Sequence, residues 1–244
     1  YLERIVLYNS LGDFDTAKAL LSERKFHPWE GGEGKVVSQY ILCHVELAKK
    51  SIINGCYEAA LSYLESLEFY PHNLGEGKLP GAQENDIYFL QGLIYNELEN
   101  KAEAKEMFSR ATIGSSEPEQ AIFYNDPQPD KIFYQGLSWQ YLGNNDKAKT
   151  IFDALIEFSA RHVADDIKID YFAVSLPDLL VFDQDLNHKN KNHCYYLAGL
   201  GYLGLRDYNT ATSEFKKVLA TDSNHQGAIT HLNLIEFLQW YDSK

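Results

Sequence analysis

Residues 88–111 repeat apolar side chains at the three- and four-residue spacing of an α-helix, on both sides of a short polar turn at residues 99–101. This pattern predicts two short amphipathic helices that pack against each other in opposite directions. The same pattern of apolar and polar positions returns at residues 132–155 and again at residues 195–218. A chain that repeats one helix–turn–helix unit is expected to stack its units into a solenoid.

A glycine stands midway along the first predicted helix of each copy, at Gly92, Gly136 and Gly199. Glycine inside a helix lowers stability by roughly 1 kcal/mol relative to alanine, so its presence predicts that the second helix approaches closely. That helix presents a small side chain and, four residues later on the same face, an aromatic ring. The pairs are Ala104 and Phe108, Ala148 and Phe152, and Ala211 and Phe215.

The order of bulky aromatic, small residue, tyrosine, alanine and phenylalanine in residues 88–111 and 195–218 resembles the tetratricopeptide repeat (TPR). The resemblance implies an all-α, right-handed superhelical solenoid of TPR-like helix pairs. We expect one domain over residues 1–244, ending in a C-terminal capping helix. Its predicted parts are units at about 1–35, 36–84, 85–129, 130–192 and 193–225, with the cap at 226–244.

The predicted units are longer than plain repeats. Ala48, Gly92 and Gly136 hold equivalent places 44 residues apart, whereas a TPR unit has about 34 residues. Long inter-repeat loops are therefore expected. A larger step separates Gly136 from Gly199, which predicts an extended insertion at residues 164–192.

Two of the predicted loops share the tetrapeptide Gly-Glu-Gly-Lys, at residues 32–35 and 75–78. A phosphate-binding loop is not indicated, because the earlier glycine and the following Ser or Thr of that motif are missing. One interpretation is structural: the glycines form tight turns and the charged residues pair or cap a helix. The other is that the loops stack on one face of the solenoid and bind a partner. The candidate binding residues are Trp29, Glu30, Glu33, Lys35, His72, Asn73, Glu76 and Lys78.

Further candidate binding residues lie in the predicted groove and in the insertion. The first helices of such repeats line a concave groove, where Leu93, Leu137 and Leu200 are expected to make an apolar surface. The polar and aromatic candidates beside them are Asn96, Gln140 and Tyr141, and the insertion adds Asp183 and Asp185. A metal site built from these aspartates with His188 or His193 is the alternative that we do not favour, since nothing fixes a third ligand.

Charge and composition limit the kinds of partner that the chain is expected to bind. The chain has 22 Lys and Arg against 35 Asp and Glu, a formal net charge of −13, which argues against nucleic acid and anionic membranes. No apolar run reaches the roughly 20 residues of a membrane span. Cys43, Cys56 and Cys194 form no metal-binding or disulfide pattern and are expected to be free, buried thiols. We expect no cofactor, no metal and no catalytic residues, because no hydrolase or metalloprotease motif stands in the sequence.

A second resemblance rests on the loop motifs HPWEGGEGKV and NLGEGKLPG and on the run YFAVSLPDLLVFDQDL. These look like the C-terminal repeat region of large, uncharacterised bacterial proteins whose upstream part resembles a carbohydrate-active β-sandwich. The leading hypothesis is a non-catalytic protein-interaction scaffold that binds a protein or an upstream domain of the same polypeptide. The alternative is an accessory domain of a carbohydrate-processing enzyme, with a glycan as ligand. Because the chain starts at Tyr1, localisation is left open: the cytoplasm is slightly favoured, and a signal peptide removed earlier is the alternative.

Overall fold

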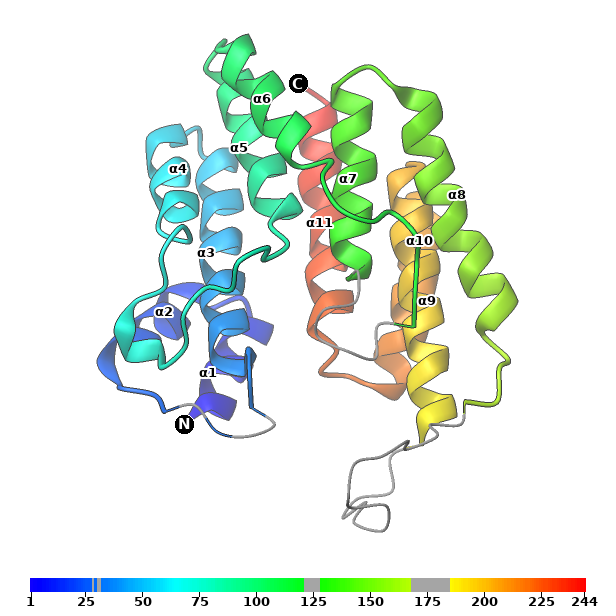
Figure 1. Ribbon diagram of the computed structural model, residues 1–244, viewed down its shortest axis with the longest axis horizontal. Helices are drawn as coiled ribbons and strands as arrows, with labels where there is room; N and C mark the ends of the chain where they lie inside the picture. The colour runs from blue at the N-terminus through cyan, green and yellow to red at the C-terminus, as the bar shows by residue number, and fades with distance from the viewer. Residues whose placement is uncertain (28, 30–31, 121–127, 168–184) are drawn as a thin grey trace. The chain divides into compact units, whose positions relative to one another are not determined.

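The all-α prediction is confirmed by a computed structural model, which describes residues 1–27, 29, 32–120, 128–167 and 185–244 (Figure 1). The described residues form eleven α-helices, one short 3-10 helix and no strand. The helices are α1 (Leu2–Ser10), α2 (Phe14–Glu23), α3 (Lys35–Ile53), α4 (Tyr57–Glu65), η1 (His72–Leu74), α5 (Asn85–Glu97), α6 (Lys101–Arg110), α7 (Pro129–Tyr141), α8 (Asn145–His162), α9 (Leu186–Gly204), α10 (Tyr208–Thr221) and α11 (Gln226–Asp242).

The chain divides into two compact units. The first contains residues 1–114 and 141–143, and therefore α1 to α6. The second contains residues 115–140 and 144–244, and therefore most of α7 and all of α8 to α11. Within each unit, consecutive helices pack as pairs, and α11 is the single helix that follows the last pair. The prediction of a final unpaired helix is thus confirmed.

The mid-helix glycines have the packing role that the sequence predicts, with one correction. A Cβ atom built on Gly92 would lie 2.6 Å from the ring of Phe108. On Gly136 or Gly199 it would lie 2.4 Å from the ring of Phe152 or Phe215, respectively. The second helix does approach closely, but the phenylalanine ring, rather than the alanine four residues earlier, is what excludes a side chain.

The turns inside the five helix pairs share one backbone feature. In each turn, the residue before the N-cap of the second helix has a positive φ angle. Three of these residues are glycines, which adopt this conformation readily, and two carry side chains. They are Gly12 (78°), Gly55 (71°), Glu99 (59°), Gly143 (81°) and Arg206 (65°).

Asn85 is the first residue of α5, and its side-chain amide donates to the carbonyl oxygens of Ala111 and Ile113 at 2.8 and 2.9 Å. One predicted boundary is wrong for an identifiable reason. Residues 186–192 were expected to be extended but are helical, because Asp185 caps α9. The side chain of Asp185 accepts from the backbone N–H of His188, which starts the helix earlier than the repeat spacing suggests.

Candidate functional site

The two loops that carry the repeated tetrapeptide lie against each other, as the sequence predicts. We call them the loop pair: the described residues between α2 and α3 (24–27, 29 and 32–34) and residues 66–84, between α4 and α5. The backbone N–H of Gly34 donates to Glu76 Oε2 at 2.7 Å. Gly34 is the N-cap of α3, so the carboxylate of one loop stabilises the positive end of the helix that follows the other loop.

A second connection in the loop pair comes from Asn73 of η1. Its side-chain amide donates to the carbonyl oxygens of Leu21 and Arg24 at 2.8 and 2.9 Å, and its own carbonyl accepts from the N–H of Phe26 at 2.7 Å. Figure 1 shows the η1 segment beside the connection from α2 to α3. Asn73, a predicted binding residue, therefore has a structural role: it satisfies carbonyls at the end of α2 that have no partner within the helix.

The two copies of the tetrapeptide have different backbone conformations. In the first copy the second glycine, Gly34, has the positive φ angle of 75° and leads directly into α3. In the second copy the first glycine, Gly75, has φ of 83° and ends η1. The two identical tetrapeptides therefore do not form the same ligand-binding loop twice.

The charged residues of the loop pair also make different contacts in the two copies. Lys78 forms an ion pair with Glu84 and donates to the carbonyl of Leu67 at 3.3 Å, whereas Lys35 and Glu33 are exposed at the start of α3. His72 is exposed on η1. Glu30, another predicted site residue, lies outside the described residues.

Large apolar side chains are exposed on the loop pair. Trp29 is 44% exposed, Phe69 78% and Leu79 64%. The Trp29 ring covers Gly32 so closely that a Cβ on Gly32 would lie 1.9 Å from the indole. The indole thus rests on Gly32, and the absence of a side chain at this glycine makes this possible. Phe69 and Leu79 were not among the predicted site residues, because an exposed apolar residue in a loop cannot be told from a buried one by sequence.

The predicted groove residues contribute mainly to internal contacts. Asn96 accepts a hydrogen bond from Lys101 Nζ at 2.8 Å, and the Gln140 amide donates to the carbonyl of Gly204 at 3.0 Å. Tyr141, which belongs to the first unit, stacks on Phe108 with ring centres 4.9 Å apart. The expected apolar surface is absent at its three named positions, since Leu93, Leu137 and Leu200 are each 0% exposed.

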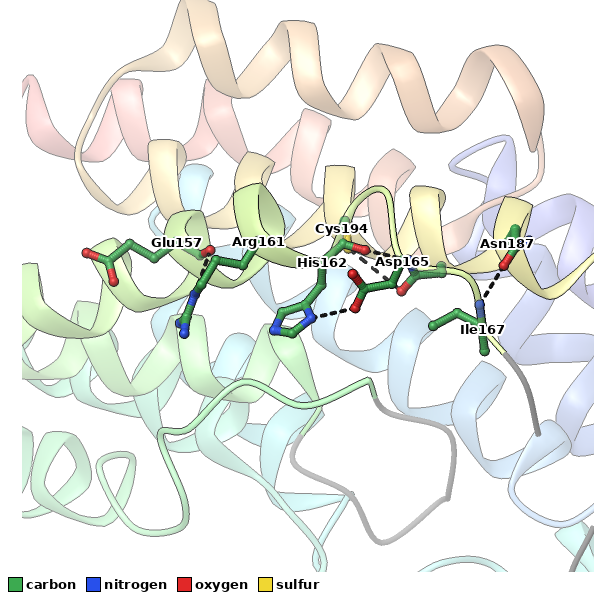
Figure 2. Close-up of polar contacts among 8 residues, drawn as sticks. Glu157, Arg161, His162, Asp165, Ile167, Asn187 and Cys194 are labelled. Atoms are coloured by element: carbon green, nitrogen blue, oxygen red, sulfur yellow. Dashed lines mark hydrogen bonds and ion pairs between the residues drawn. The ribbon is translucent and has the colours of Figure 1, made fainter. Parts of the chain in front are cut away.

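Polar contacts join the end of α8 to the beginning of α9 (Figure 2). The Asn187 amide oxygen accepts from the N–H of Ile167 at 2.7 Å, and its amide nitrogen donates to Asp166 Oδ1 at 3.1 Å. His162 Nδ1 lies 2.7 Å from Asp165 Oδ2. The two contacts of Asn187 therefore join the residues that follow α8 to the first turn of α9. The predicted site residue Asp183 lies outside the described residues.

The remaining candidates for metal binding make other contacts. Asp185 caps α9, and His193 Nε2 lies 2.8 Å from the carbonyl oxygen of Glu119, so the imidazole donates to it. His188 is exposed and its Nε2 lies 3.4 Å from Asn192 Nδ2. Among the residues that the structure describes, no three His, Cys, Asp or Glu side chains gather where they could hold a metal ion.

The cysteines are free, as predicted, but only two of them are buried. Burial raises the pKa of the Cys43 thiol to about 12 and that of the Cys194 thiol to about 11. Such thiols are poor nucleophiles at neutral pH. Cys56 is exposed at the N-cap of α4, so the prediction of burial is wrong there.

Sequence reasoning missed a recurrent structural use of asparagine. Asn73, Asn85 and Asn190 each donate a side-chain hydrogen bond to a carbonyl at the end of another helix, namely α2, α6 and α8. These carbonyls lack partners within their own helices. The asparagines are at unrelated places in the repeat, so no spacing in the sequence could have identified them.

Comparison with known proteins places repeats in both units. Residues 86–112 and residues 132–158 each match a family model described as tetratricopeptide repeat. The pair α9–α10 has the same contact between glycine and phenylalanine. No solved structure matches the chain. In the described part of the chain, no helix combines the length and apolar character needed to cross a membrane. Tetratricopeptide repeats are typically non-catalytic and suggest a protein-interaction scaffold.

Proposed function

We propose that this chain is a scaffold that binds a protein partner through the loop pair. The observation that carries the proposal is the exposure of Trp29, Phe69 and Leu79 on two loops that are fixed to each other and to the helices. Aromatic side chains are enriched in interfaces, and a few residues near the centre of an interface supply most of its binding energy. The partner is a separate protein or an adjacent domain of the same polypeptide.

The internal hydrogen bonds of the loop pair support this proposal. Glu76 and Asn73 hold the loops through contacts 42 and 52 residues apart in the sequence. A surface that is ordered before binding loses less conformational entropy when the partner arrives. The loop pair therefore presents its apolar side chains at a lower entropic cost than two independent loops would.

The groove is the weaker candidate for the same interface. Its three named leucines are buried, and Asn96 and Gln140 form hydrogen bonds within the chain. A partner in the groove would have to compete with these contacts. The loop pair offers apolar surface that is already exposed.

The experiment is affinity capture with cross-linking from cells that produce the protein, using three baits. They are the wild type, the double variant Phe69→Ser/Leu79→Ser, and the control Leu7→Ser/Leu11→Ser. The control removes two aliphatic side chains that are 56% and 80% exposed but lie at α1, outside the loop pair. We expect a partner that wild type and control capture equally and that the loop variant captures at least about tenfold less. Equal capture by all three baits would refute the proposal.

A glycan is the second candidate ligand, and the placement of Trp29 favours it. An indole that rests on Gly32 and remains 44% exposed can stack against a sugar ring. Glu76, a candidate binding residue, has one carboxylate oxygen already occupied by the N–H of Gly34. Titration with oligosaccharides should quench the fluorescence of wild type and of Trp139→Phe, but not of Trp29→Phe. Quenching that persists in Trp29→Phe would exclude this site.

A further inference from the structure

The first turn of α11 is capped by a histidine. His225 is the N-cap residue, and its Nδ1 accepts from the backbone N–H of Ala228 at 3.0 Å. Most N-caps are Ser, Thr, Asp or Asn, whose oxygen atoms accept at neutral and mildly acidic pH. An imidazole nitrogen accepts only while it carries no proton. The cap of α11 therefore exists only with a neutral His225 ring.

The surroundings of His225 favour the neutral ring. Burial lowers the pKa of His225, and the carboxylate of Asp222, in the connection between α10 and α11, opposes this effect. From α9, the ring of Tyr196 lies 5.1 Å away, and His193 is close enough that the charge of His225 further lowers the pKa of His193. Burial is the main cause of the lowered pKa of His193 as well. A proton on His225 thus opposes protonation of His193.

The turn that His225 caps leads directly to the contact between α11 and α9. His231, six residues further along α11, is 3% exposed, and its Nδ1 lies 2.8 Å from the Gly227 carbonyl and 3.0 Å from Tyr196 Oη. Its ring lies among aromatic rings of three other helices, which are Phe133 of α7, Tyr196 of α9 and Phe215 of α10. Fraying of the first turn would displace Gly227 and weaken this contact.

We propose that His225 is a proton-sensitive latch: when its imidazole takes up a proton, α11 loses its N-cap, and the first turn of α11 detaches from α9 while α8, α9 and α10 stay folded. The proposal is independent of the loop pair, which belongs to the first unit.

The direction of the pH dependence follows from the lowered pKa values. The detached turn exposes His225, whose pKa then returns to about 6.5, so the detached state binds more protons than the closed state. The closed state, in which the first turn of α11 packs on α9, is most stable above about pH 6.5. It becomes less stable as the pH falls toward the lower pKa that His225 has in this state. One proton changes the closing equilibrium by at most about tenfold per pH unit.

Amide hydrogen exchange on the intact chain, measured at pH 7.5 and pH 5.5 and corrected for the intrinsic exchange rate, tests the latch. We expect protection of residues 226–231 to fall between about threefold and tenfold at the lower pH, while α9 and α10 keep their protection. His225→Asn is the matched variant, because an asparagine oxygen caps at both pH values. It should keep high protection without pH dependence. Equal pH dependence in wild type and His225→Asn would overturn the proposal.

An NMR titration of the wild-type His225 ring supplies a measurement that requires no variant. A ring that titrates below about 6.5, together with loss of the Ala228 amide protection over the same pH range, supports the latch. A ring that titrates at or above 6.5, or without change at Ala228, overturns it. The variant His225→Asn removes the charge beside His193, which lowers the pKa of His193. It should therefore raise the pH at which His193 titrates, and no change would refute the coupling between the two rings.

Discussion

Repeated sequence gives a repeated structure in the helix pairs but not in the loop pair. In α5–α6, α7–α8 and α9–α10, the same residues give the same geometry: a Cβ atom on the glycine would lie 2.4–2.6 Å from a phenylalanine ring. In the loop pair, the same four letters give two backbone conformations, with the positive φ angle on the second glycine of one copy and on the first glycine of the other.

The difference depends on where the interaction partners are encoded. In each helix pair, the glycine and its phenylalanine are both inside the repeated stretch, so each copy includes its own partner. In the loop pair the partners lie outside the residue's own copy: Gly34 donates to Glu76 of the other copy. Lys78 is followed six residues later by Glu84, with which it pairs, whereas the same step from Lys35 reaches Ile41. A repeated motif therefore implies a repeated structure only when it includes the residues that hold it.

The largest effect is expected at Phe152, whose ring touches the backbone of two glycines. A Cβ on Gly136 or Gly204 would lie 2.4 or 2.2 Å from this ring, which is 0% exposed. Phe152→Ala should lower the free energy of unfolding by about 3–5 kcal/mol, because it leaves a cavity that the helices cannot close. Urea unfolding followed by circular dichroism measures the change. Phe69→Ala, at a 78% exposed ring, is the control and should change stability by less than about 0.5 kcal/mol.

The three glycines of the helix pairs should respond alike if their geometry is the same. Gly92→Ala, Gly136→Ala and Gly199→Ala should each lower the free energy of unfolding by about 1–3 kcal/mol, because overpacking against the ring outweighs the better helix propensity of alanine. Urea unfolding of all three variants tests this. In the double variant Gly136→Ala/Phe152→Leu, the alanine should be less destabilising than it is beside Phe152. A stabilising Gly→Ala change at any of the three positions would show that the pairs are not equivalent.

The two glutamates of the repeated tetrapeptide should respond differently. Glu76→Ala removes the carboxylate that accepts from Gly34, and it should lower stability by about 0.5–2 kcal/mol, the range for loss of a helix cap. Glu33→Ala, at an exposed position, should change stability by less than about 0.5 kcal/mol. Thermal or urea unfolding of both variants tests the comparison. Equal effects would mean that the contact between Glu76 and Gly34 contributes nothing to folding.

Much of the fold could be predicted because its determinants are local. The N-caps Asp13, Asn144 and Asp207 each accept from the N–H three residues later, and such caps mark helix starts in the sequence. The candidate site was harder to predict because its contacts are distant. Asn73 reaches a carbonyl 52 residues away and Glu76 an N–H 42 residues away. Only the packing of successive helix pairs brings these groups together. No sequence pattern could therefore distinguish loop residues that hold the fold from loop residues that remain exposed.

The smallest expected effect is at the second glycine of each tetrapeptide. Gly34 has φ of 75°, a conformation that costs a residue with a side chain about 1–2 kcal/mol, although nothing lies within 4 Å of its Cβ position. Gly77 also has open space around its Cβ position but does not have a positive φ angle. Gly34→Ala should therefore lower the free energy of unfolding by about 1 kcal/mol. Gly77→Ala should leave it unchanged or raise it slightly, because alanine restricts the unfolded chain. Urea unfolding of the two variants separates backbone conformation from packing, since neither new methyl group meets another atom. Equal losses of stability would mean that the two copies adopt the same conformation in solution, and the contrast with the helix pairs would then be wrong.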